Sequence, residues 1–337
     1  MAKPPVAVVT GAAGFIGSHM VDLLLEHGYR VRGIDNLSGG RREHLAHHEG
    51  NPALAFEVRD VRSLAPDDPL FAGARYVFHF AGIGDIVPSI ERPVDYLSAN
   101  VMGTVCALEA ARAAGVAKFV YAASSSCYGL ATELPTTERA PISPQYPYAL
   151  SKHLGELAVM HWGTVYRLPV VSLRIFNAYG PRSRTTGAYG AVFGVFLAQK
   201  LARKPFTVVG DGSQRRDFIF VTDLVRAFLL AAESDYGQAM FNVGAGQPQS
   251  INRLVELMGG EVVHVPKRPG EPDCTWADIT KIRQRLGWGP RVSFEEGVRR
   301  MLEHIEFWRG APVWDAELIT EATAPWFQYL AQVGARP

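Results

Sequence analysis

The sequence predicts an α/β fold in which a doubly wound parallel sheet carries a smaller, interleaved C-terminal lobe. Apolar, β-branched runs alternate with segments of helical periodicity up to about residue 180, which is the pattern of parallel strands joined by helices. Beyond that point the elements are shorter and more broken, but an apolar run near residues 240–244 is suited to return to the first sheet. We therefore expect one domain over residues 1–180, completed by the returning strand, and a lobe formed mostly by residues 181–337.

A glycine-rich turn joins the first predicted strand to the first predicted helix. The apolar run over residues 6–10 is followed by Gly11, Gly14 and Gly17, at intervals of three. Backbone N–H groups of such a turn, together with a helix N-terminus, attract phosphate. A second apolar run ends at Asp35, whose carboxylate can accept from both hydroxyls of an adenosine ribose and would repel a 2′-phosphate. This βαβ pattern predicts a Rossmann-like dinucleotide site that prefers NAD to NADP.

The composition is that of an ordinary globular protein. A net charge of +1 gives no basic excess for nucleic acid, and no apolar run approaches bilayer-spanning length. The N-terminus runs straight into the first strand with no signal-peptide pattern. We therefore expect a cytoplasmic protein that binds neither nucleic acid nor membrane.

The sequence offers little for a structural metal. Its three cysteines are widely separated and make neither a disulfide framework nor a metal site. The group of His44, His47 and His48 has no acid–histidine framework around it in the sequence, so we expect a solvated helix end there. No metal is predicted.

Polar residues lie near several other strand ends. Asp60 follows a short apolar run over residues 54–58, where its carboxylate can accept from an adenine amino group or cap the next helix. His79 lies inside an apolar run and is expected to be a core histidine. Asn100 lies on the otherwise apolar helix predicted over residues 95–114, and we expect it to tie neighbouring loops together.

Tyr148 and Lys152 are spaced for chemistry. They lie four residues apart at the start of a predicted helix, which places both on one face. A neighbouring ammonium stabilises a phenolate and is expected to lower the tyrosine pKa from its usual value of about 10. Tyr148 then becomes a general base near neutral pH. Ser124, at the end of a predicted strand over residues 118–124, is suited to orient the reacting oxygen.

With these motifs the chain resembles an extended short-chain dehydrogenase/reductase of the NAD-dependent nucleotide-sugar epimerase/dehydratase family, and is most similar to UDP-hexose 4-epimerases. The resemblance reaches to about residue 305 and rests on residues 10–17, 35–37, 124–129, 148–152, 176–181, 210–223 and 268–278. It implies an NAD-binding Rossmann domain, a smaller nucleotide-sugar lobe and a homodimer packed through the helices at residues 95–114 and at Tyr148. The aromatic tail over residues 314–329 lies beyond the shared pattern and is expected to pack on the body or at an interface.

The resemblance assigns a role to each site residue. The catalytic set is Ser124, Tyr148 and Lys152. The residues implied in NAD binding are Gly11, Gly14, Phe15, Ile16, Gly17, Asp35, Asn36, Ser38, Gly39, Asp60, Val61, Phe80, Ala81, Gly82, Asn100, Ala122, Tyr148, Lys152 and Phe176. The residues implied in UDP-sugar binding are Ser89, Ser124, Ser125, Ser126, Tyr148, Asn177, Ala191, Val192, Thr207, Arg216, Arg268, Glu271 and Thr275. Arginine forks suit a diphosphate, which supports the two arginines independently.

The stretch after Ser124 separates the reactions of the family. Dehydratases resemble Thr-Asp-Glu-Val-Tyr-Gly here, and their two acids transfer protons, whereas this chain has Ser125 and Ser126. Two serines cannot act as that acid–base pair. UDP-glucuronate decarboxylases usually have a glutamate at the Ser126 position, and serine-rich versions are similar to 4-epimerases. The expected reaction is therefore inversion of C4 of a UDP-hexose through a transient 4-keto sugar.

The substrate itself is left open among several UDP-sugars. Residues 187–192 resemble the segment of epimerases that act on N-acetylhexosamines, and Thr275 replaces a bulky tyrosine, leaving room for an acetamido group. UDP-glucuronate stays an alternative, because Ser125, Ser126 and Arg182 could bind a C6 carboxylate. A dehydratase or reductase of the same family and an NAD-sensing binding protein are the further alternatives.

Overall fold

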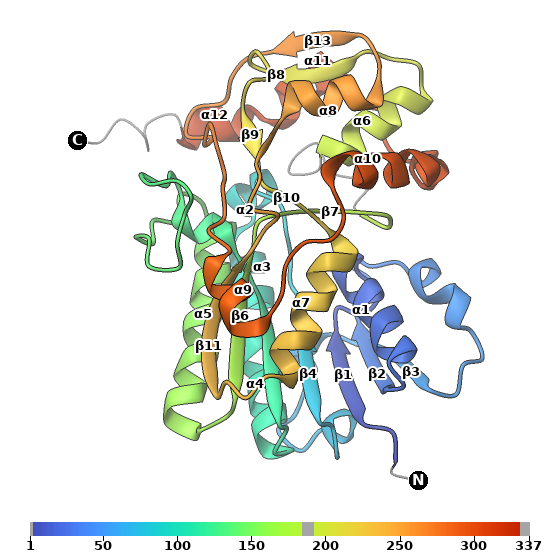
Figure 1. Ribbon diagram of the computed structural model, residues 1–337, viewed down its shortest axis with the longest axis vertical. Coiled ribbons are helices and arrows are strands. Elements are labelled where there is room, and N and C mark those ends of the chain that lie inside the picture. The colour runs from blue at the N-terminus through green and yellow to red at the C-terminus, as the bar shows by residue number, and fades with distance from the viewer. Residues whose placement is uncertain (1–2, 184–191, 331–337) are drawn as a thin grey trace.

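A seven-stranded parallel sheet forms the centre of the computed structural model, which describes residues 3–183 and 192–330 (Figure 1). The strand order is β11-β6-β5-β4-β1-β2-β3. The strands are β1 (Val6–Thr10), β2 (Arg30–Asp35), β3 (Leu54–Val58), β4 (Tyr76–His79), β5 (Lys118–Ser124), β6 (Val170–Ile175) and β11 (Gln238–Val243). The order reverses between β1 and β4, so ligands are expected beyond the carboxyl ends of these strands. The predicted fold class is confirmed, and β11 is the returning strand, paired in parallel with β6.

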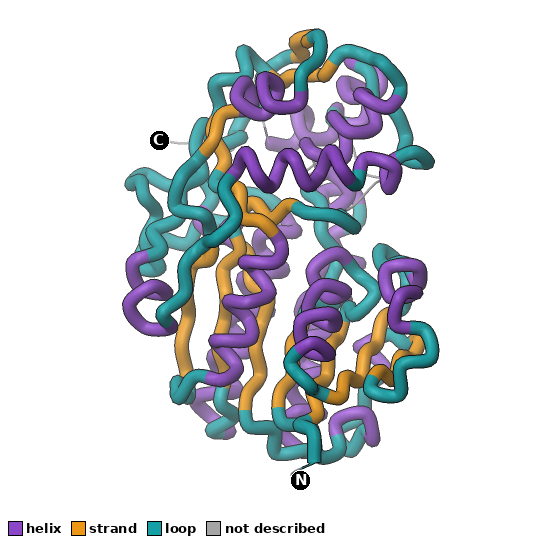
Figure 2. The backbone as a smooth tube through the Cα atoms, turned by 45° about the vertical axis from the view of Figure 1, so that its right-hand side comes forward, coloured by secondary structure: helices purple, strands orange, loops and turns teal. Residues whose placement is uncertain are grey.

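Helices cover both faces of this sheet (Figure 2). On one face α1 (Phe15–Glu26) and α7 (Val221–Glu233) pack against each other, and Met20, Leu24 and Phe228 enter the core there. On the other face α4 (Gly103–Ala113) and α5 (Pro147–Tyr166) bury Leu108 and Val159. The short helix α9 (Thr280–Leu286) packs beside β11. This three-layer arrangement leaves the carboxyl edge of the sheet free to build a site.

The helix predicted over residues 95–114 is divided. It consists of α3 (Pro93–Leu97), one π-helical turn η4 (Ser98–Met102) and α4. The wide turn contains Asn100, whose Oδ1 accepts from the Ile83 N–H at 2.7 Å and whose Nδ2 donates to Ser151 Oγ at 2.8 Å. Single π turns occur often at functional sites because they redirect a side chain. Asn100 thus ties the loop after β4 to α5, as expected.

The second lobe lies above the carboxyl edge of the sheet in Figure 1. Two short parallel pairs contribute to it, β7 (Asn177–Tyr179) with β10 (Phe218–Phe220) and β8 (Phe206–Val209) with β13 (Val262–Val265). An antiparallel pair joins β9 (Arg215–Arg216) to β12 (Gln249–Ser250). Its helices are α6 (Val192–Leu201), α8 (Ile251–Met258), α10 (Phe294–Glu303), the 3-10 turn η6 (Ile305–Trp308), α11 (Ala316–Ala322) and α12 (Ala324–Leu330).

The aromatic tail packs on the body of the chain. Trp326 of α12 is 2% exposed and lies in a small apolar cluster with Val87 of α2 (Val87–Glu91), Leu330 and Tyr146. Its indole N–H donates to the Pro269 carbonyl at 2.6 Å. Of the two expectations for this tail, the described structure supports packing on the body. None of the helices it describes has the length and apolar character needed to cross a bilayer.

Candidate active site

A cavity of about 1300 Å³ lies beyond the carboxyl ends of β1, β2, β4, β5 and β6 and is closed by residues of the second lobe. Most of the predicted site residues share its wall. They are Gly11, Gly14, Phe15, Ile16, Gly17, Asp35, Asn36, Ser38, Gly39, Asp60, Val61, Phe80, Ala81, Gly82, Ala122, Ser124, Ser125, Ser126, Tyr148, Lys152, Phe176, Asn177, Val192, Thr207, Arg216, Arg268, Glu271 and Thr275. Residues from nearly the whole chain therefore converge on one site.

The glycine turn allows no side chain at two of its positions. Gly11 has φ +69°, and a Cβ there would lie 2.8 Å from the Ala81 backbone nitrogen. A Cβ on Gly17 would lie 2.0 Å from the Gly11 carbonyl oxygen. The turn passes directly into α1, which has no side-chain cap at Gly14. The first N–H groups of α1 therefore have no side-chain acceptor, and they belong to residues that line the cavity. The turn and the uncapped helix end fit the pyrophosphate of a dinucleotide.

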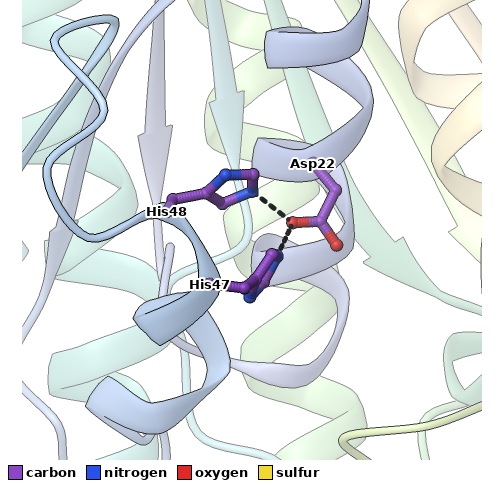
Figure 3. Close-up of side chains that lie close together, drawn as sticks. All are labelled: Asp22, His47 and His48. Atoms are coloured by element: carbon purple, nitrogen blue, oxygen red, sulfur yellow. Dashed lines mark hydrogen bonds and ion pairs between the residues drawn. The ribbon is translucent and has the colours of Figure 1, made fainter.

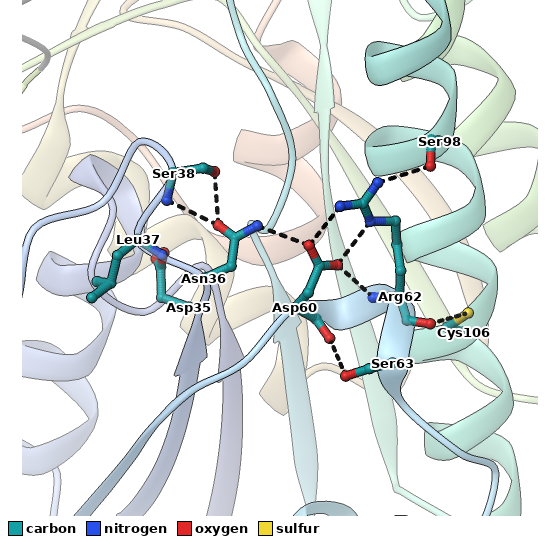
Figure 4. Close-up of polar contacts among 9 residues, drawn as sticks. All are labelled: Asp35, Asn36, Leu37, Ser38, Asp60, Arg62, Ser63, Ser98 and Cys106. Carbon is teal, nitrogen blue, oxygen red and sulfur yellow. Dashed lines mark hydrogen bonds and ion pairs between the residues drawn. The ribbon is translucent and has the colours of Figure 1, made fainter.

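Acidic and amide side chains surround the end of β2 (Figure 4). Asp35 is buried, and its carboxylate accepts from the backbone N–H groups of Ala13 at 3.1 Å and Leu37 at 2.8 Å. Burial raises the pKa of Asp35, and these N–H bonds oppose that rise. The Asn36 amide donates to Asp60 at 2.9 Å, which joins the ends of β2 and β3. This polar rim fits the adenosine end of NAD.

Asp60 is held by Arg62, which the sequence reasoning missed. Asp60 caps the 3-10 turn η2 (Val61–Ser63) by accepting from the Arg62 N–H at 2.8 Å, so the capping interpretation is correct. The Arg62 guanidinium also bonds Asp60 at 2.7 Å and holds the pKa of that carboxyl well below its usual range. Both side chains line the cavity. The proximity of Arg62 to Asp60 in the sequence was the available signal.

Lys152 and Tyr148 of α5 face the inner part of the cavity with Ser124 of β5. Lys152 is 7% exposed and its Nζ lies 4.6 Å from the centre of the Tyr121 ring. Burial lowers the pKa of Lys152 to about 8. The prediction that the Tyr148 pKa is lowered is wrong when only the groups of the protein are considered. Burial raises that pKa, and a hydrogen bond with Ser124 opposes the rise. Desolvation penalises the charged phenolate and is the largest cause of this rise.

The three consecutive serines, residues 124–126, line the same cavity. The Oγ atoms of Ser124 and Ser126 lie 2.7 Å apart, and the Ser126 N–H donates to Ser124 Oγ at 3.2 Å. Cys127 is buried, and burial raises its thiol pKa to about 12, so it is an inert core residue. Sequence reasoning did not identify Tyr146 and Trp326, which also line the cavity. Trp326 belongs to the tail beyond residue 305, where the resemblance to the family ends. No sequence motif near Trp326 predicted that it would line the cavity.

Charged and polar side chains occupy the lobe side of the cavity. Arg216 bonds Glu271 at 2.7 Å and donates to the Pro272 carbonyl at 2.8 Å. Arg268 lies 3.7 Å from Glu271. Thr275 Oγ1 donates to Asn177 Oδ1 at 2.8 Å, which fixes that amide at the cavity wall. The pair of guanidinium groups fits a diphosphate.

Two of the predicted site residues are not among the described residues that line the cavity. Ser89 is fully buried and donates to the Ile86 carbonyl at 2.5 Å within its own short helix, so it is a helix-start residue away from the cavity wall. The Asn100 amide is consumed by Ile83 and Ser151, so it supports the site without lining it. Ala191 lies outside the described residues, as does most of the segment 187–192.

His79 is a core histidine, as expected. It is fully buried and its ring nitrogens lie 2.7 Å from Thr10 Oγ1 and 3.0 Å from Thr104 Oγ1. Burial lowers its pKa to about 3, so it stays neutral near pH 7.

Of the other three histidines, His47 is exposed as predicted, whereas His48 is partly buried and His44 is buried. His44 is buried and hydrogen-bonds the Ala13 carbonyl at 2.8 Å, which contradicts its expected place on a solvated helix end. His47 and His48 both contact Asp22 Oδ1 at 2.8 Å (Figure 3), so an acid does lie beside them. Asp22 belongs to α1, distant in the sequence, which is why the pattern did not show it. Its second oxygen pairs with Arg182 at 2.8 Å, a cation that opposes metal binding at this cluster.

Comparison with known proteins shows the family of this chain. The sequence model of the NAD-dependent epimerase/dehydratase family matches residues 7–244. The chain belongs to that family. UDP-glucose 4-epimerase of Mycolicibacterium smegmatis is 38% identical over 306 residues, which cover 88% of this chain and 97% of that relative. The enzyme therefore uses NAD as its cofactor, as family members do.

Solved structures of this family superpose on the whole fold. UDP-N-acetylglucosamine 4-epimerase from Methanobrevibacter ruminantium, solved with UDP-N-acetylmuramic acid, has a TM-score of 0.85 and 31% identity over 90% of this chain and 99% of its own. UDP-glucuronic acid 4-epimerase from Bacillus cereus, solved with UDP-glucuronic acid and NAD, has a TM-score of 0.83 and 31% identity over 89% and 99%. This chain is thus an NAD-dependent UDP-sugar 4-epimerase or a related dehydratase.

Proposed function

We propose that this enzyme is a 4-epimerase of neutral UDP-hexoses, either UDP-glucose and UDP-galactose or their N-acetylhexosamine counterparts. The observation that carries the proposal is the convergence of Ser124, Tyr148 and Lys152 beside two uncharged serines at the inner end of the cavity. Dehydration needs carboxyl groups where Ser125 and Ser126 stand. A regulatory NAD-binding protein would not require the complete catalytic set. The similarity to the Mycolicibacterium smegmatis enzyme supports the same reaction.

The chain's residues divide the work of epimerisation. Tyr148 accepts the proton of the sugar C4 hydroxyl, Ser124 orients that oxygen, and Lys152 stabilises the resulting phenolate. The glycine turn and the Asp35 and Asp60 rim would hold NAD, which would supply the acceptance and return of hydride. Arg216 and Arg268 hold the diphosphate while the 4-keto sugar turns, and Tyr148 then returns the proton. The division into a cofactor domain over residues 1–180 with β11 and a sugar-nucleotide lobe over 181–337 is part of this proposal.

A UDP-glucuronate 4-epimerase is the second candidate. Arg182 lines the cavity, and its buried Nη1 has no hydrogen-bond partner in the described part of the chain, so this group is able to donate to a carboxylate. The Nη2 of Arg182, however, is paired with Asp22 of α1 at 2.8 Å. This ion pair supports a structural role for Arg182. The neutral sugars are favoured for this reason.

Turnover on UDP-glucose, UDP-N-acetylglucosamine and UDP-glucuronate tests the proposal. We expect kcat/KM for at least one neutral sugar to exceed that for UDP-glucuronate by about tenfold or more, the value of one or two lost polar contacts. Product identity is read by NMR of the C4 proton. A preference for UDP-glucuronate supports the second candidate, and a 4-keto-6-deoxy product or complete inactivity with NAD bound refutes epimerisation.

We also propose a homodimer formed through α4, α5 and η4. Large apolar side chains stand exposed on or beside these elements: Val94, Met102, Leu150 and Leu157. An exposed apolar patch of this kind is typical of an interface. Sedimentation velocity should give twice the mass of the 36.9 kDa chain, and a charged substitution, Leu157→Glu, should return the monomer. A monomeric wild-type chain at micromolar concentration contradicts this proposal.

A further inference from the structure

Tyr146 lies immediately before α5 and contacts the catalytic tyrosine. Its ring is parallel to that of Tyr148, with 6.4 Å between the ring centres and 6° between the planes. Its ring also packs against Trp326, with the two centres 6.0 Å apart. Trp326 is anchored in turn by its bond to the Pro269 carbonyl. The Tyr146 ring is therefore held by two residues that are far apart in the sequence, Tyr148 and Trp326.

The hydroxyl of Tyr146 is the outer member of a chain of four hydroxyl groups. Tyr146 hydrogen-bonds with the Ser126 side chain. Ser126 Oγ lies 2.7 Å from Ser124 Oγ, and Ser124 hydrogen-bonds with Tyr148. All four residues line the cavity. The 2.7 Å contact between the two serines thus joins Tyr146 to Tyr148.

The donor and acceptor inventory gives this chain a direction. Burial raises the pKa of Tyr146, so its phenol keeps its proton near pH 7 and can donate to Ser126. A serine hydroxyl has one proton and two lone pairs. Ser124 Oγ already accepts from the Ser126 N–H at 3.2 Å, and a second bond accepted from Ser126 Oγ fills its remaining lone pair. With no sugar bound, the Ser124 proton is then directed to the Tyr148 oxygen, and with a sugar bound the same proton is shared with the C4 oxygen.

We infer that Tyr146 is a positioning residue for the reaction, which acts through Ser126 and Ser124 to hold a hydrogen bond on the Tyr148 phenolate. The inference rests on the proposed function, in which Tyr148 is the base. A donated hydrogen bond favours a charged acceptor and lowers its pKa. This contribution offsets part of the desolvation that burial imposes on Tyr148. Trp326 serves the same end by holding the Tyr146 ring.

Tyr146→Phe tests the inference because it keeps the ring and both ring contacts while removing the hydroxyl. The ionisation of Tyr148 is followed by tyrosinate absorbance in the NAD-loaded protein, with Tyr148→Phe as the background for subtraction. We expect the Tyr148 midpoint to move to higher pH, so that kcat on the acid limb falls by about threefold to tenfold while the alkaline plateau stays within about twofold. A merely structural role would lower the rate equally at all pH values.

Ser126→Ala is the matched variant, because it breaks the same chain one link nearer to Tyr148. It should shift the midpoint in the same direction, and the double variant should shift it no further than Ser126→Ala alone. An unshifted Tyr146→Phe titration, or additive shifts in the double variant, overturns the inference. The absorbance titration needs no sugar, so failure of the proposed function is recognised separately, as NAD-loaded protein that titrates at Tyr148 but turns over no UDP-sugar.

Discussion

Replacing Tyr148 with phenylalanine is expected to lower kcat by about 10²–10⁴-fold, the range for loss of a general acid–base group. Among the described residues that line the cavity, Tyr146 is the tyrosine next to Tyr148. Its hydroxyl is engaged by Ser126, so it does not replace the lost phenol. The substitution removes one oxygen and keeps the ring contacts with Tyr96 and Tyr146. NAD should stay bound, because the glycine turn and the Asp35 rim are untouched. Steady-state kinetics and the cofactor absorbance of the purified protein measure the two effects.

Tyr29→Phe is the control for this substitution. Tyr29 is a buried tyrosine whose hydroxyl donates to Glu233 at 3.0 Å, and it is not among the described residues that line the cavity. Its loss should cost about 1 kcal/mol of stability and leave kcat within about twofold. Retention of more than about a tenth of the wild-type kcat in Tyr148→Phe would contradict the role of Tyr148 as the base.

The parts of the fold that local patterns determine could be predicted from the sequence. Strands buried on both faces read as apolar runs, so β1, β4, β5 and β6 were visible. The turn at Gly11 was visible as well, because its three glycines follow one another closely, and the contact that excludes a Cβ at Gly17 is made with the Gly11 carbonyl of the same turn. Tyr148 and Lys152 were recognisable because helical spacing places them on one face.

Contacts made across long separations could not be read in this way. Asp22 meets His47 and His48 only because α1 and η1 (Arg42–His48) fold side by side. Trp326 reaches the cavity from the last described helix, about 180 residues after its neighbour Tyr146. The burial of Ser89 depends on the packing of a short helix, and a sequence pattern carries no measure of burial.

Burial also explains why the pKa of Tyr148 was predicted in the wrong direction. The spacing of Tyr148 and Lys152 correctly indicated an ammonium on the same face, but both groups are desolvated. Desolvation penalises the charged form of each, so the phenol pKa rises and the ammonium pKa falls. The site therefore holds two groups in costly states, which is common where function and stability compete.

Lys152→Met should change stability and activity in opposite directions. Below pH 8 the Lys152 ammonium is charged in both folded and unfolded protein, and its burial imposes its full cost on the folded state. Removing it should raise the free energy of unfolding at pH 7 by about 1–3 kcal/mol, after the lost contact with the Tyr121 ring is allowed for. Activity should fall by about 10²-fold or more, because the phenolate loses its cation. Urea denaturation and steady-state kinetics measure the two changes.

The pH dependence of this gain has a defined sign. Between pH 8 and about 10.5 the folded wild type has released the Lys152 proton while the unfolded chain still binds it, so wild-type stability rises with pH and the advantage of Lys152→Met shrinks. Lys118→Met is the matched control. Lys118 is also buried, but it donates to the Ser234 carbonyl at 2.8 Å and to the Tyr236 carbonyl, and it lies at the opposite end of β5 from Ser124. Its removal leaves two carbonyls without their donor, so it should lower stability and leave kcat unchanged. A Lys152→Met protein that is less stable than wild type at pH 7 would contradict this prediction. It would show that the contacts of the Lys152 ammonium stabilise the folded state by more than its desolvation costs.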